Sequence, residues 1–403
     1  MPLELRAITD NEAEAFRDCL MQTFGHDEAD ADPGGAARQR VLIAPGQAWG
    51  AFDRGAIVGT AATFDHVLGM PGGDSLRMAG LTMVTVRPTH RRRGILRSLM
   101  QLHLDDAKQR GYPISGLWAS EAAIYGRFGY GTAAYGDALE IKQAHALEVA
   151  VDGAPDDLAQ VDELAARALL PDIYERATAQ RPGALRRSEV WWRERRFLEV
   201  PFMRGGASRR RHVVARRGDA CVGYVAYRQR PGFVGGVPSG KAEIIELVGL
   251  DARAEASLWR YMLALDLHPH VTWGNAPVDD PLPWLVDDAR RISRSPSDTL
   301  WLRVEDVPAT LAARRFAADG ALRFAVDDAT WQLVVREGRG QTEPTTQAPE
   351  LRLSRTLLGT ALLGGTSLTR LARAGRLTGD AAAIARADQM FVSAIAPWCP
   401  EVF

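Results

Sequence analysis

The pattern of apolar and polar residues predicts a central strand that leads through a turn into a helix. Residues 81–87 are rich in β-branched side chains and alternate in polarity, which is typical of a half-buried strand, and Pro88 ends it. From Ile95 to Gly111 apolar residues recur at helical spacing. A partner strand is predicted at residues 114–120, followed by a short helix and a Gly/aromatic turn. We therefore expect the rest of the chain to be built around this succession of elements.

The segments before the central strand predict an α+β fold whose sheet carries the site. A first strand and a helix are followed by a β-meander, and strand, helix and strand come next, which is an α+β order of elements. The expected strands lie at residues 3–10, 47–52, 57–67 and 75–78, and the expected helix runs through Phe16, Leu20 and Met21.

The length of the chain predicts more than one domain. A single core rarely grows past about 250–300 residues, and the chain has 403. We place a first domain at residues 1–148, completed by a strand or two after Ala134, a second at 149–292 and a third at 293–403. The second repeats the element order of the first, but its strand ending at Gly249 is not followed by an Arg/Gly turn.

The later domains are expected to contain further strands and helices, and their polar segment 337–348 is expected to be disordered. The predicted helices lie at 158–168, 188–197, 254–267, 308–316, 355–363, 367–374 and 380–394, and the predicted strands at 212–215, 221–227, 242–249, 299–304, 322–326 and 330–336.

Composition and charge do not call for several classes of partner. The net charge of −1 gives no reason to expect a nucleic acid or an acidic membrane. The three cysteines are far apart, so neither a disulfide framework nor a C-x-x-C metal site is expected, and a reducing cytoplasm fits. No apolar run reaches 18 residues and no signal-peptide pattern opens the chain. We therefore expect a cytoplasmic protein without a bound metal or a membrane span.

The turn between the central strand and its helix has the residues of an anion site. Arg91, Arg92 and Arg93 precede Gly94, which lets the backbone curl so that the first N–H groups of the helix converge. The helix dipole favours an anion at that point, and guanidinium groups add forked donors for phosphate oxygens. The turn is therefore a candidate phosphate site.

Three stretches resemble a known family. The sequence Arg91-x-x-Gly94-x-Leu96 resembles the pyrophosphate signature Q/R-x-x-G-x-G/A of the GNAT superfamily of N-acetyltransferases, with Leu96 where Gly or Ala is usual. Residues 88–94 and 119–131, together with the sequence Glu401-Val402-Phe403, resemble the Eis (enhanced intracellular survival) acetyltransferases. The resemblance extends over the whole chain in length and layout.

The resemblance implies an enzyme that moves the acetyl group of acetyl-CoA to amines of cationic substrates, such as aminoglycosides or polyamines. It implies a GNAT domain, a degenerate GNAT-like domain without a cofactor loop and a sterol-carrier-like C-terminal domain, assembled as a homo-hexamer. The implied acetyl-CoA contacts are Val84, Thr85, Val86, Arg91, Arg92, Arg93, Gly94, Ile95, Leu96 and Ser120. The alternative is a lipid-binding or regulatory protein with a vestigial acetyltransferase fold.

The same resemblance implies two catalytic groups. Tyr125 matches the tyrosine that protonates the departing thiolate, and the carboxylate of Phe403 matches the general base. Without the surrounding motif, Tyr125 would be interpreted as a core residue packed on Phe128, and a terminus would be interpreted as frayed. The apolar, Pro-containing sequence of residues 397–403 argues against fraying.

The implied amine pocket includes residues from both ends of the chain. The acidic, Gly/Pro-rich segment 24–35 is either a solvated loop or an acidic lip, and either His26 or Asp27 matches the family's amine-binding carboxylate. Glu401 lies either in the pocket or on a solvated rim. The implied set is Phe24, His26, Asp27, Met83 and Glu401.

Overall fold

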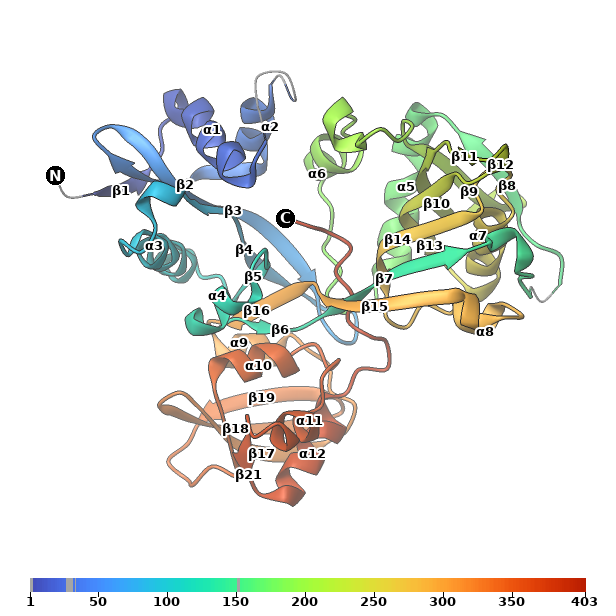
Figure 1. The fold of residues 1–403 in the computed structure, drawn as a ribbon. Coiled ribbons are helices and arrows are strands. Elements are labelled where there is room, and N and C mark those ends of the chain that lie inside the picture. Colours follow the sequence, from blue (N-terminus) through green and yellow to red (C-terminus); the bar gives the residue numbers. More distant parts are fainter. Residues whose placement is uncertain (1–2, 27–31, 33, 151–152) are drawn as a thin grey trace. The chain divides into compact units, whose positions relative to one another are not determined.

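The computed structural model describes residues 3–26, 32, 34–150 and 153–403 and is drawn in Figure 1. The chain forms two compact units. The first unit contains residues 1–134, 180–186 and 298–403, and the second contains residues 135–179 and 187–297.

A seven-stranded sheet organises the N-terminal part of the first unit, in the order β1-β2-β3-β4-β5-β16-β6. Its strands are β1 (Glu4–Ala7), β2 (Ile43–Asp53), β3 (Ala56–Gly69), β4 (Ser75–Val86), β5 (Ile114–Trp118), β6 (Gly131–Thr132) and β16 (Leu300–Val304). Strands β1 to β4 pair antiparallel, whereas β4 and β5 pair parallel. The helix α3 (Ile95–Gln109) is the crossover between β4 and β5.

Helices cover both faces of this sheet (Figure 1). Successive strand residues point to opposite faces, and on β3 Ala61 packs with α3 residues while Ala62 packs with Phe16 and Cys19 of α1 (Ala13–Phe24). The short helices α2 (Gly35–Leu42) and α4 (Ala122–Tyr125) complete this part. The predicted central strand and its helix are confirmed, and the strand expected at 75–78 is the start of the same continuous strand β4.

The predicted end of the first domain was wrong. The strand after Ala134, β7 (Tyr135–Lys142), pairs with β14 (His270–Pro277) in the sheet of the second unit. The strand expected to open the third domain, β16, instead pairs with β5 and β6 in the first sheet. Alternating polarity predicts a strand but not the sheet that it joins, so periodicity could not assign either one.

The second unit has its own seven-stranded sheet, in the order β15-β7-β14-β13-β10-β9-β8. Its further strands are β8 (Asp157–Val161), β9 (Arg211–Arg217), β10 (Ala220–Arg230), β13 (Lys241–Gly249) and β15 (Ile292–Asp298), with a hairpin of β11 (Phe233–Val234) and β12 (Val237–Pro238). Its helices are α5 (Glu163–Thr178), α6 (Glu189–Trp191) with a π-helix at Trp192–Arg196, α7 (Ala252–Leu263) and α8 (Leu282–Leu285).

One helix boundary in the second unit was also predicted incorrectly. The helix expected at 158–168 begins only at Glu163, because residues 157–161 form strand β8 against β9. The carboxylate of Asp162 accepts a hydrogen bond from the backbone N of Ala165 at 2.8 Å and caps the helix at that point.

The C-terminal part of the first unit is a five-stranded sheet covered by helices, in the order β19-β18-β17-β20-β21. The strands are β17 (Gly320–Val326), β18 (Ala329–Arg336), β19 (Arg339–Pro344), β20 (Leu351–Leu353) and β21 (Thr378–Gly379), and the helices are α9 (Val307–Ala312), α10 (Arg355–Ala361), α11 (Leu368–Arg373) and α12 (Ala381–Phe391). The expectation of disorder at 337–348 was wrong, since β19 pairs with β18 through its backbone, which polar side chains do not prevent.

A single hydrophobic core joins the two parts of the first unit. Met78 and Ile114 of the first sheet pack in one cluster with Leu302 of β16 and with Leu322 and Leu358 of the C-terminal part. Among the described residues no helix is long and apolar enough to cross a bilayer.

Candidate active site

Strand β4 carries a bulge at the position of Met83. Thr85 pairs with Thr60 and Thr82 pairs with Ala62, so two residues of β4 lie opposite one residue of β3. Met83 has a φ of 55°. The hydroxyl of Thr60 donates to the carbonyl oxygen of Met83 at 2.7 Å and lies 2.6 Å from the hydroxyl of Thr85. The neighbouring strand therefore fixes the distorted backbone at residues 83–85.

Strands β4 and β5 separate just before this bulge. Met78, Ala79 and Gly80 pair in parallel with Ile114, Ser115 and Gly116. Beyond Gly80 the described residues show no further pairing between the two strands, although β4 continues to Val86. Backbone groups at the edge of a strand can pair with an extended ligand. The predicted contacts Val84, Thr85 and Val86 lie on this separated part of β4.

The turn after β4 leaves the start of helix α3 open. Arg92 and Gly94 have positive φ angles of 62° and 81°, and Gly94 is the N-cap residue. The first helical hydrogen bond there runs from the N of Ser98 to the carbonyl oxygen of Gly94 at 3.1 Å. No described side chain caps this end. The N–H groups of Ile95, Leu96 and the next residue are therefore available to an anion, whereas the side chain of Ile95 is buried in the core.

The three arginines of the turn are not equivalent. Arg93 Nη1 lies 3.2 Å from Asp53 Oδ2, and His90 Nε2 lies 3.1 Å from the same oxygen. The hydrogen bond with His90, followed by that with Arg93, lowers the pKa of Asp53. Arg91 and Arg92 are exposed and form no ion pair with any residue that the structure describes. Two of the three predicted guanidinium groups are therefore available to a ligand.

Tyr125 is a buried residue at the end of α4. Its ring lies edge-on to that of Tyr130, with centroids 6.3 Å apart, and Phe128 packs partly buried against the same cluster. Burial raises the pKa of Tyr125, and a hydrogen bond with the side chain of Ser120 offsets part of the rise. Ser120, predicted as a cofactor contact, is thus brought to the predicted acid. The structure also gives Tyr125 the packing of a core residue. The predicted role as an acid and the alternative of a core residue packed on Phe128 are therefore compatible.

A buried polar network lies behind these residues, and sequence reasoning missed it. His103 of α3 contacts the hydroxyl of Thr63 through Nδ1 at 2.7 Å and the hydroxyl of Ser115 through Nε2 at 2.8 Å. Ser115 Oγ also lies 2.7 Å from the hydroxyl of Tyr130 and donates to the carbonyl oxygen of Ala79 at 3.0 Å. Burial lowers the pKa of His103 to about 3. The network ties β3, α3, β4 and β5 together where β4 and β5 still pair.

The C-terminal segment is buried rather than frayed. The N of Trp398 donates to the carbonyl oxygen of Pro182 at 2.9 Å, and Arg181 donates to the carbonyl oxygen of Ala396 at 2.9 Å. Cys399 and Glu401 are only 0% and 3% exposed. A solvated rim is therefore excluded for Glu401.

Phe403 lies at the point where β4 and β5 separate. Its ring is edge-on to the imidazole of His66, with centroids 4.8 Å apart. A side-chain atom added to Gly80 would come within 3.2 Å of this ring. On β3, His66 lies on the same face as Ala62 because the two are separated by an even number of residues, and Ala62 packs with α1. Phe403 thus approaches the sheet from the face that α1 covers.

The residues predicted to contact the amine lie in different parts of the first unit. Met83 packs against the cluster of Phe16 and Cys19 on the α1 face. Phe24 and His26, at the end of α1, are exposed, and the N of His26 donates to the carbonyl oxygen of Met21 at 3.0 Å. Asp27 lies outside the described residues. Met83, Glu401 and the end of α1 belong to one unit, but a single amine pocket formed by them stays a prediction.

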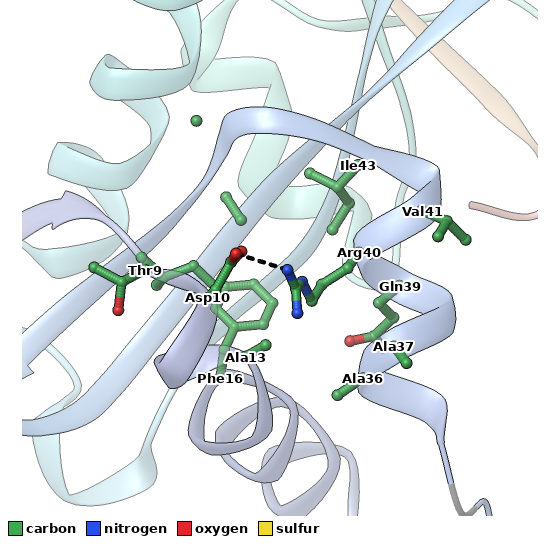
Figure 2. A pocket seen from close by; sticks show the side chains of 13 residues that line it. Thr9, Asp10, Ala13, Phe16, Ala36, Ala37, Gln39, Arg40, Val41 and Ile43 are labelled. Carbon is green, nitrogen blue, oxygen red and sulfur yellow. Dashed lines mark ion pairs between the residues drawn. The ribbon is translucent and has the colours of Figure 1, made fainter.

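A separate pocket of about 540 Å³ opens between the start of α1 and α2 (Figure 2). Figure 2 shows Asp10 and Arg40 facing each other across it, and their ion pair measures 2.7 Å. Its lining includes Phe16 and Ala48 but none of Phe24, His26, Met83 or Glu401. Since its one acidic group is already paired, this pocket has no charge for a cationic amine.

The corresponding helix start in the second unit is closed to anions. The carboxylate of Asp251 accepts a hydrogen bond from the N of Ala254 at 2.9 Å and caps α7. Arg217 donates to the same carboxylate at 2.8 Å and, chiefly for this reason, the pKa of Asp251 falls to about 2. A fixed negative charge thus occupies the place where the first unit leaves N–H groups open, which supports the prediction that this unit lacks a cofactor loop.

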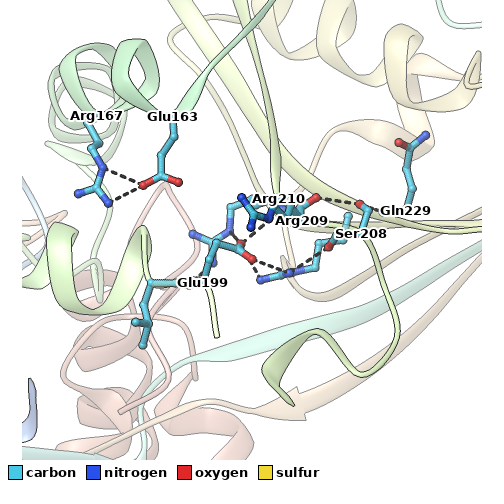
Figure 3. A network of polar contacts seen from close by, with 9 residues as sticks. Glu163, Arg167, Glu199, Ser208, Arg209, Arg210 and Gln229 are labelled. Carbon is cyan, nitrogen blue, oxygen red and sulfur yellow. Dashed lines mark hydrogen bonds and ion pairs between the residues drawn. The ribbon is translucent and has the colours of Figure 1, made fainter. Parts of the chain in front are cut away.

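Other charges of the second unit are paired within its structure. Figure 3 shows Glu199 beside Arg210, and the backbone N of Arg210 donates to Glu199 at 3.3 Å. Arg228 donates to both oxygens of Glu199, at 2.9 and 3.1 Å. Burial lowers the pKa of Arg210 to about 10. These contacts fasten the segment before β9 to strand β10 and indicate a structural role.

Comparison with known proteins agrees with this geometry. Family models for an acetyltransferase (GNAT) domain match residues 4–133 and 183–304, and one for a sterol carrier protein domain matches residues 307–400. An uncharacterized N-acetyltransferase of Streptomyces coelicolor is 36% identical over 100% of both chains. The crystal structure of Eis1 from Mycobacterium abscessus has a TM-score of 0.83 and 30% identity over 100% of both chains.

By its fold and these matches the protein is a GNAT-type N-acetyltransferase. N-acetyltransferase Eis of Mycobacterium bovis is 36% identical to it over 84% of this chain and 83% of its own length. The chain therefore belongs to the Eis family of N-acetyltransferases. The predicted family, the α+β fold with two GNAT domains and a sterol-carrier-like domain, and the enzyme class are confirmed.

Proposed function

We propose that this enzyme transfers the acetyl group of acetyl-CoA to a primary amine of a cationic small molecule, such as a polyamine or an aminoglycoside. The observation that carries the proposal is the separation of β4 from β5, with an open helix start after β4 and Phe403 at the last paired residue, Gly80. One end of the separation suits an anionic donor, and the other end lies beside Phe403, whose carboxylate is the proposed base.

The donor site is proposed to combine backbone and guanidinium groups. The open N–H groups at the start of α3 bind the pyrophosphate, and Arg91 and Arg92 add charge. The unpaired edge of β4 at residues 84–86 binds the pantetheine amides as a neighbouring strand would. Bound acetyl-CoA supplies an activated thioester. The bulge at Met83 and its hydrogen bond from Thr60 hold this edge in place.

Two groups are proposed to move protons. The amine nitrogen forms a bond to the acetyl carbon, and the carbon–sulfur bond breaks. The carboxylate of Phe403 accepts the proton that the amine loses, and Tyr125 gives a proton to the thiolate. Tyr125 is protonated at neutral pH and therefore has a proton to give, and burial, which raises its pKa, keeps it in this form. Atoms and charges balance, since one proton enters and one leaves the protein.

Cation preference is proposed to come from the acidic residues near Phe403 and the end of α1. Glu401 is almost fully buried next to Phe403, and Phe24, Met83 and either His26 or Asp27 complete the proposed pocket. A buried carboxylate interacts more strongly with a cation than an exposed one does. We further propose a homo-hexamer in the cytoplasm, by resemblance to the family.

A thiol-release assay with acetyl-CoA across a panel of amines tests the function. We expect release with polyamines or aminoglycosides, and a larger rise of KM with salt for these than for a singly charged arylalkylamine, since exposed attractions are screened over about 8–10 Å. No release with any amine would oppose the proposal and favour a vestigial fold. Equal salt responses would mean that exposed charges do not select the amine, and would leave both the buried Glu401 and the acetyl transfer in place.

A further inference from the structure

His66 is a buried histidine that the proposed chemistry does not use. It lies on β3, is 5% exposed, and packs its ring edge-on to Phe403 and to Phe64, with centroid distances of 4.8 Å and 5.7 Å. The ring also lies close to Gly80 of the neighbouring strand β4.

Gly80 provides the space for this arrangement. A side-chain atom added to Gly80 would come within 2.5 Å of His66 Cδ2 and within 3.2 Å of Phe403 Cε2. Contacts of real side-chain carbons are longer than the first distance, so His66 would have to move. Gly80 is also the last residue of β4 that pairs with β5. The glycine therefore lets two rings meet at the point where the strands separate.

We propose that His66 is a positioning residue, whose ring holds Phe403 so that its carboxylate faces the acceptor amine. The inference rests on the proposed function, in which that carboxylate accepts the amine proton. A terminal residue frays unless something fixes it, and a proton acceptor must be within hydrogen-bond reach of the amine to act. The ring contact with His66 acts on the side chain of Phe403 itself, in addition to the hydrogen bonds that hold the segment at Trp398 and Cys399.

The edge-on contact of the His66 ring is the constraint that we propose. An edge-to-face pair needs an aromatic partner with a flat face or edge, and phenylalanine can supply that as well as histidine can. His66→Phe should therefore keep kcat/KM for the amine within about threefold of the wild type. His66→Ala removes the ring and should lower kcat/KM for the amine about tenfold, with KM for acetyl-CoA unchanged within twofold.

A double-mutant cycle between His66→Ala and Phe403→Ala tests whether His66 acts through Phe403. Phe403→Ala keeps the carboxylate but removes the ring. Because both variants break one contact, the double variant should lose no more than the worse single variant. Gly80→Ala is a second way to displace His66, and its effect should likewise vanish in the Phe403→Ala background. His145→Ala, at an exposed histidine, is the matched control and should leave the rates unchanged.

The outcomes separate this inference from the proposed function. The role of His66 would be overturned if the fold-losses of kcat/KM in the two single variants multiplied in the double variant. It would also be overturned if His66→Phe were as impaired as His66→Ala. In both cases acetyl transfer by the wild type would still stand. Absence of transfer by the wild type would instead remove the proposed function. Unfolding midpoints of each variant, measured alongside, show that a rate loss is not a loss of folded protein.

Discussion

The hydroxyl of Tyr130 lies 2.7 Å from Oγ of Ser115. This contact connects the aromatic residue beside Tyr125 to the pair of strands at which the sheet opens. Through Tyr130, the buried network thus connects the proposed acid, Tyr125, to the paired part of β4 and β5 next to the proposed donor site. It should matter for stability as well as for the site, because each of its buried polar groups depends on its partners.

We predict that His103 makes the first unit sensitive to acid. Burial lowers the pKa of His103 from 6.5 to about 3 in the folded protein. Between these pH values His103 binds a proton in the unfolded chain but not in the folded chain. The free energy of unfolding therefore falls as the pH drops from about 6.5 toward 3. The loss at pH 5 relative to pH 8 should be about 2 kcal/mol. Denaturant unfolding at the two pH values measures it.

His103→Gln is the control for that prediction. Glutamine can still hydrogen-bond to Thr63 and Ser115 but does not titrate. The variant should be destabilised at pH 8 by about 1–3 kcal/mol and should show a smaller difference between pH 5 and pH 8. His212, whose pKa burial lowers to about 4, stays in both proteins. An unchanged pH dependence in the variant would contradict the assignment to His103.

We predict that the arginines of the turn contribute unequally to acetyl-CoA binding. Arg92→Ala should weaken binding about tenfold, because an unpaired guanidinium can give its charge to a phosphate. Arg93→Ala should change it by threefold or less, since Arg93 already pairs with Asp53. Titration calorimetry distinguishes the two. Equal losses would mean that Arg93 leaves Asp53 when the ligand binds.

Gly94→Pro should weaken acetyl-CoA binding further than either arginine variant. Gly94 has a φ of 81°, which proline cannot adopt, so the turn would have to change shape. Gly94→Ala is the milder comparison, because no atom lies within 4 Å of the added carbon and only backbone strain, of about 1 kcal/mol, opposes it. Retained affinity in the proline variant would remove the turn from the donor site.

We predict that Tyr125→Phe lowers kcat about a hundredfold or more with little change in acetyl-CoA affinity. Positioned acids commonly contribute 10²–10⁴-fold, and phenylalanine preserves the edge-on packing with Tyr130. Steady-state rates and direct ligand titration are both needed. A fall in affinity equal to the fall in kcat would indicate a packing role instead.

We predict that one residue added after Phe403 abolishes turnover. The addition moves the carboxylate by about 3.5 Å, which breaks a hydrogen bond to the amine. Deleting Phe403 should also depress turnover, while acetyl-CoA binding persists in both variants because α3 and its turn are untouched. Full kcat in a C-terminally tagged protein would defeat the assignment of the carboxylate as base.

The parts of the site that depend on neighbouring residues could be predicted from the sequence. Gly94 and the apolar spacing from Ile95 specify an open helix start, and the structure has it. Tyr125 was located by the string of residues around it. In these cases the chemistry is set within about ten residues, where periodicity and turn preferences are informative.

The remaining parts depend on pairs that are distant in sequence. Asp53 restrains Arg93 from a separate strand, His66 meets Phe403 from the other end of the chain, and His103 meets Ser115 only after folding. A lone histidine in an apolar segment gives no sign of its partner. The sheets that β7 and β16 join could not be predicted for the same reason, because the alternating polarity of each strand fits either sheet.

The position of β16 sets the order in which the protein can mature during translation. The ribosome adds about 5–20 residues per second, and β5 is complete long before residues 300–304 emerge to cover its edge. Throughout that interval, on the order of ten seconds or more, β5 exposes an unpaired edge that could join another chain. We therefore expect the nascent chain to be most prone to association with other chains in the interval before β16 arrives.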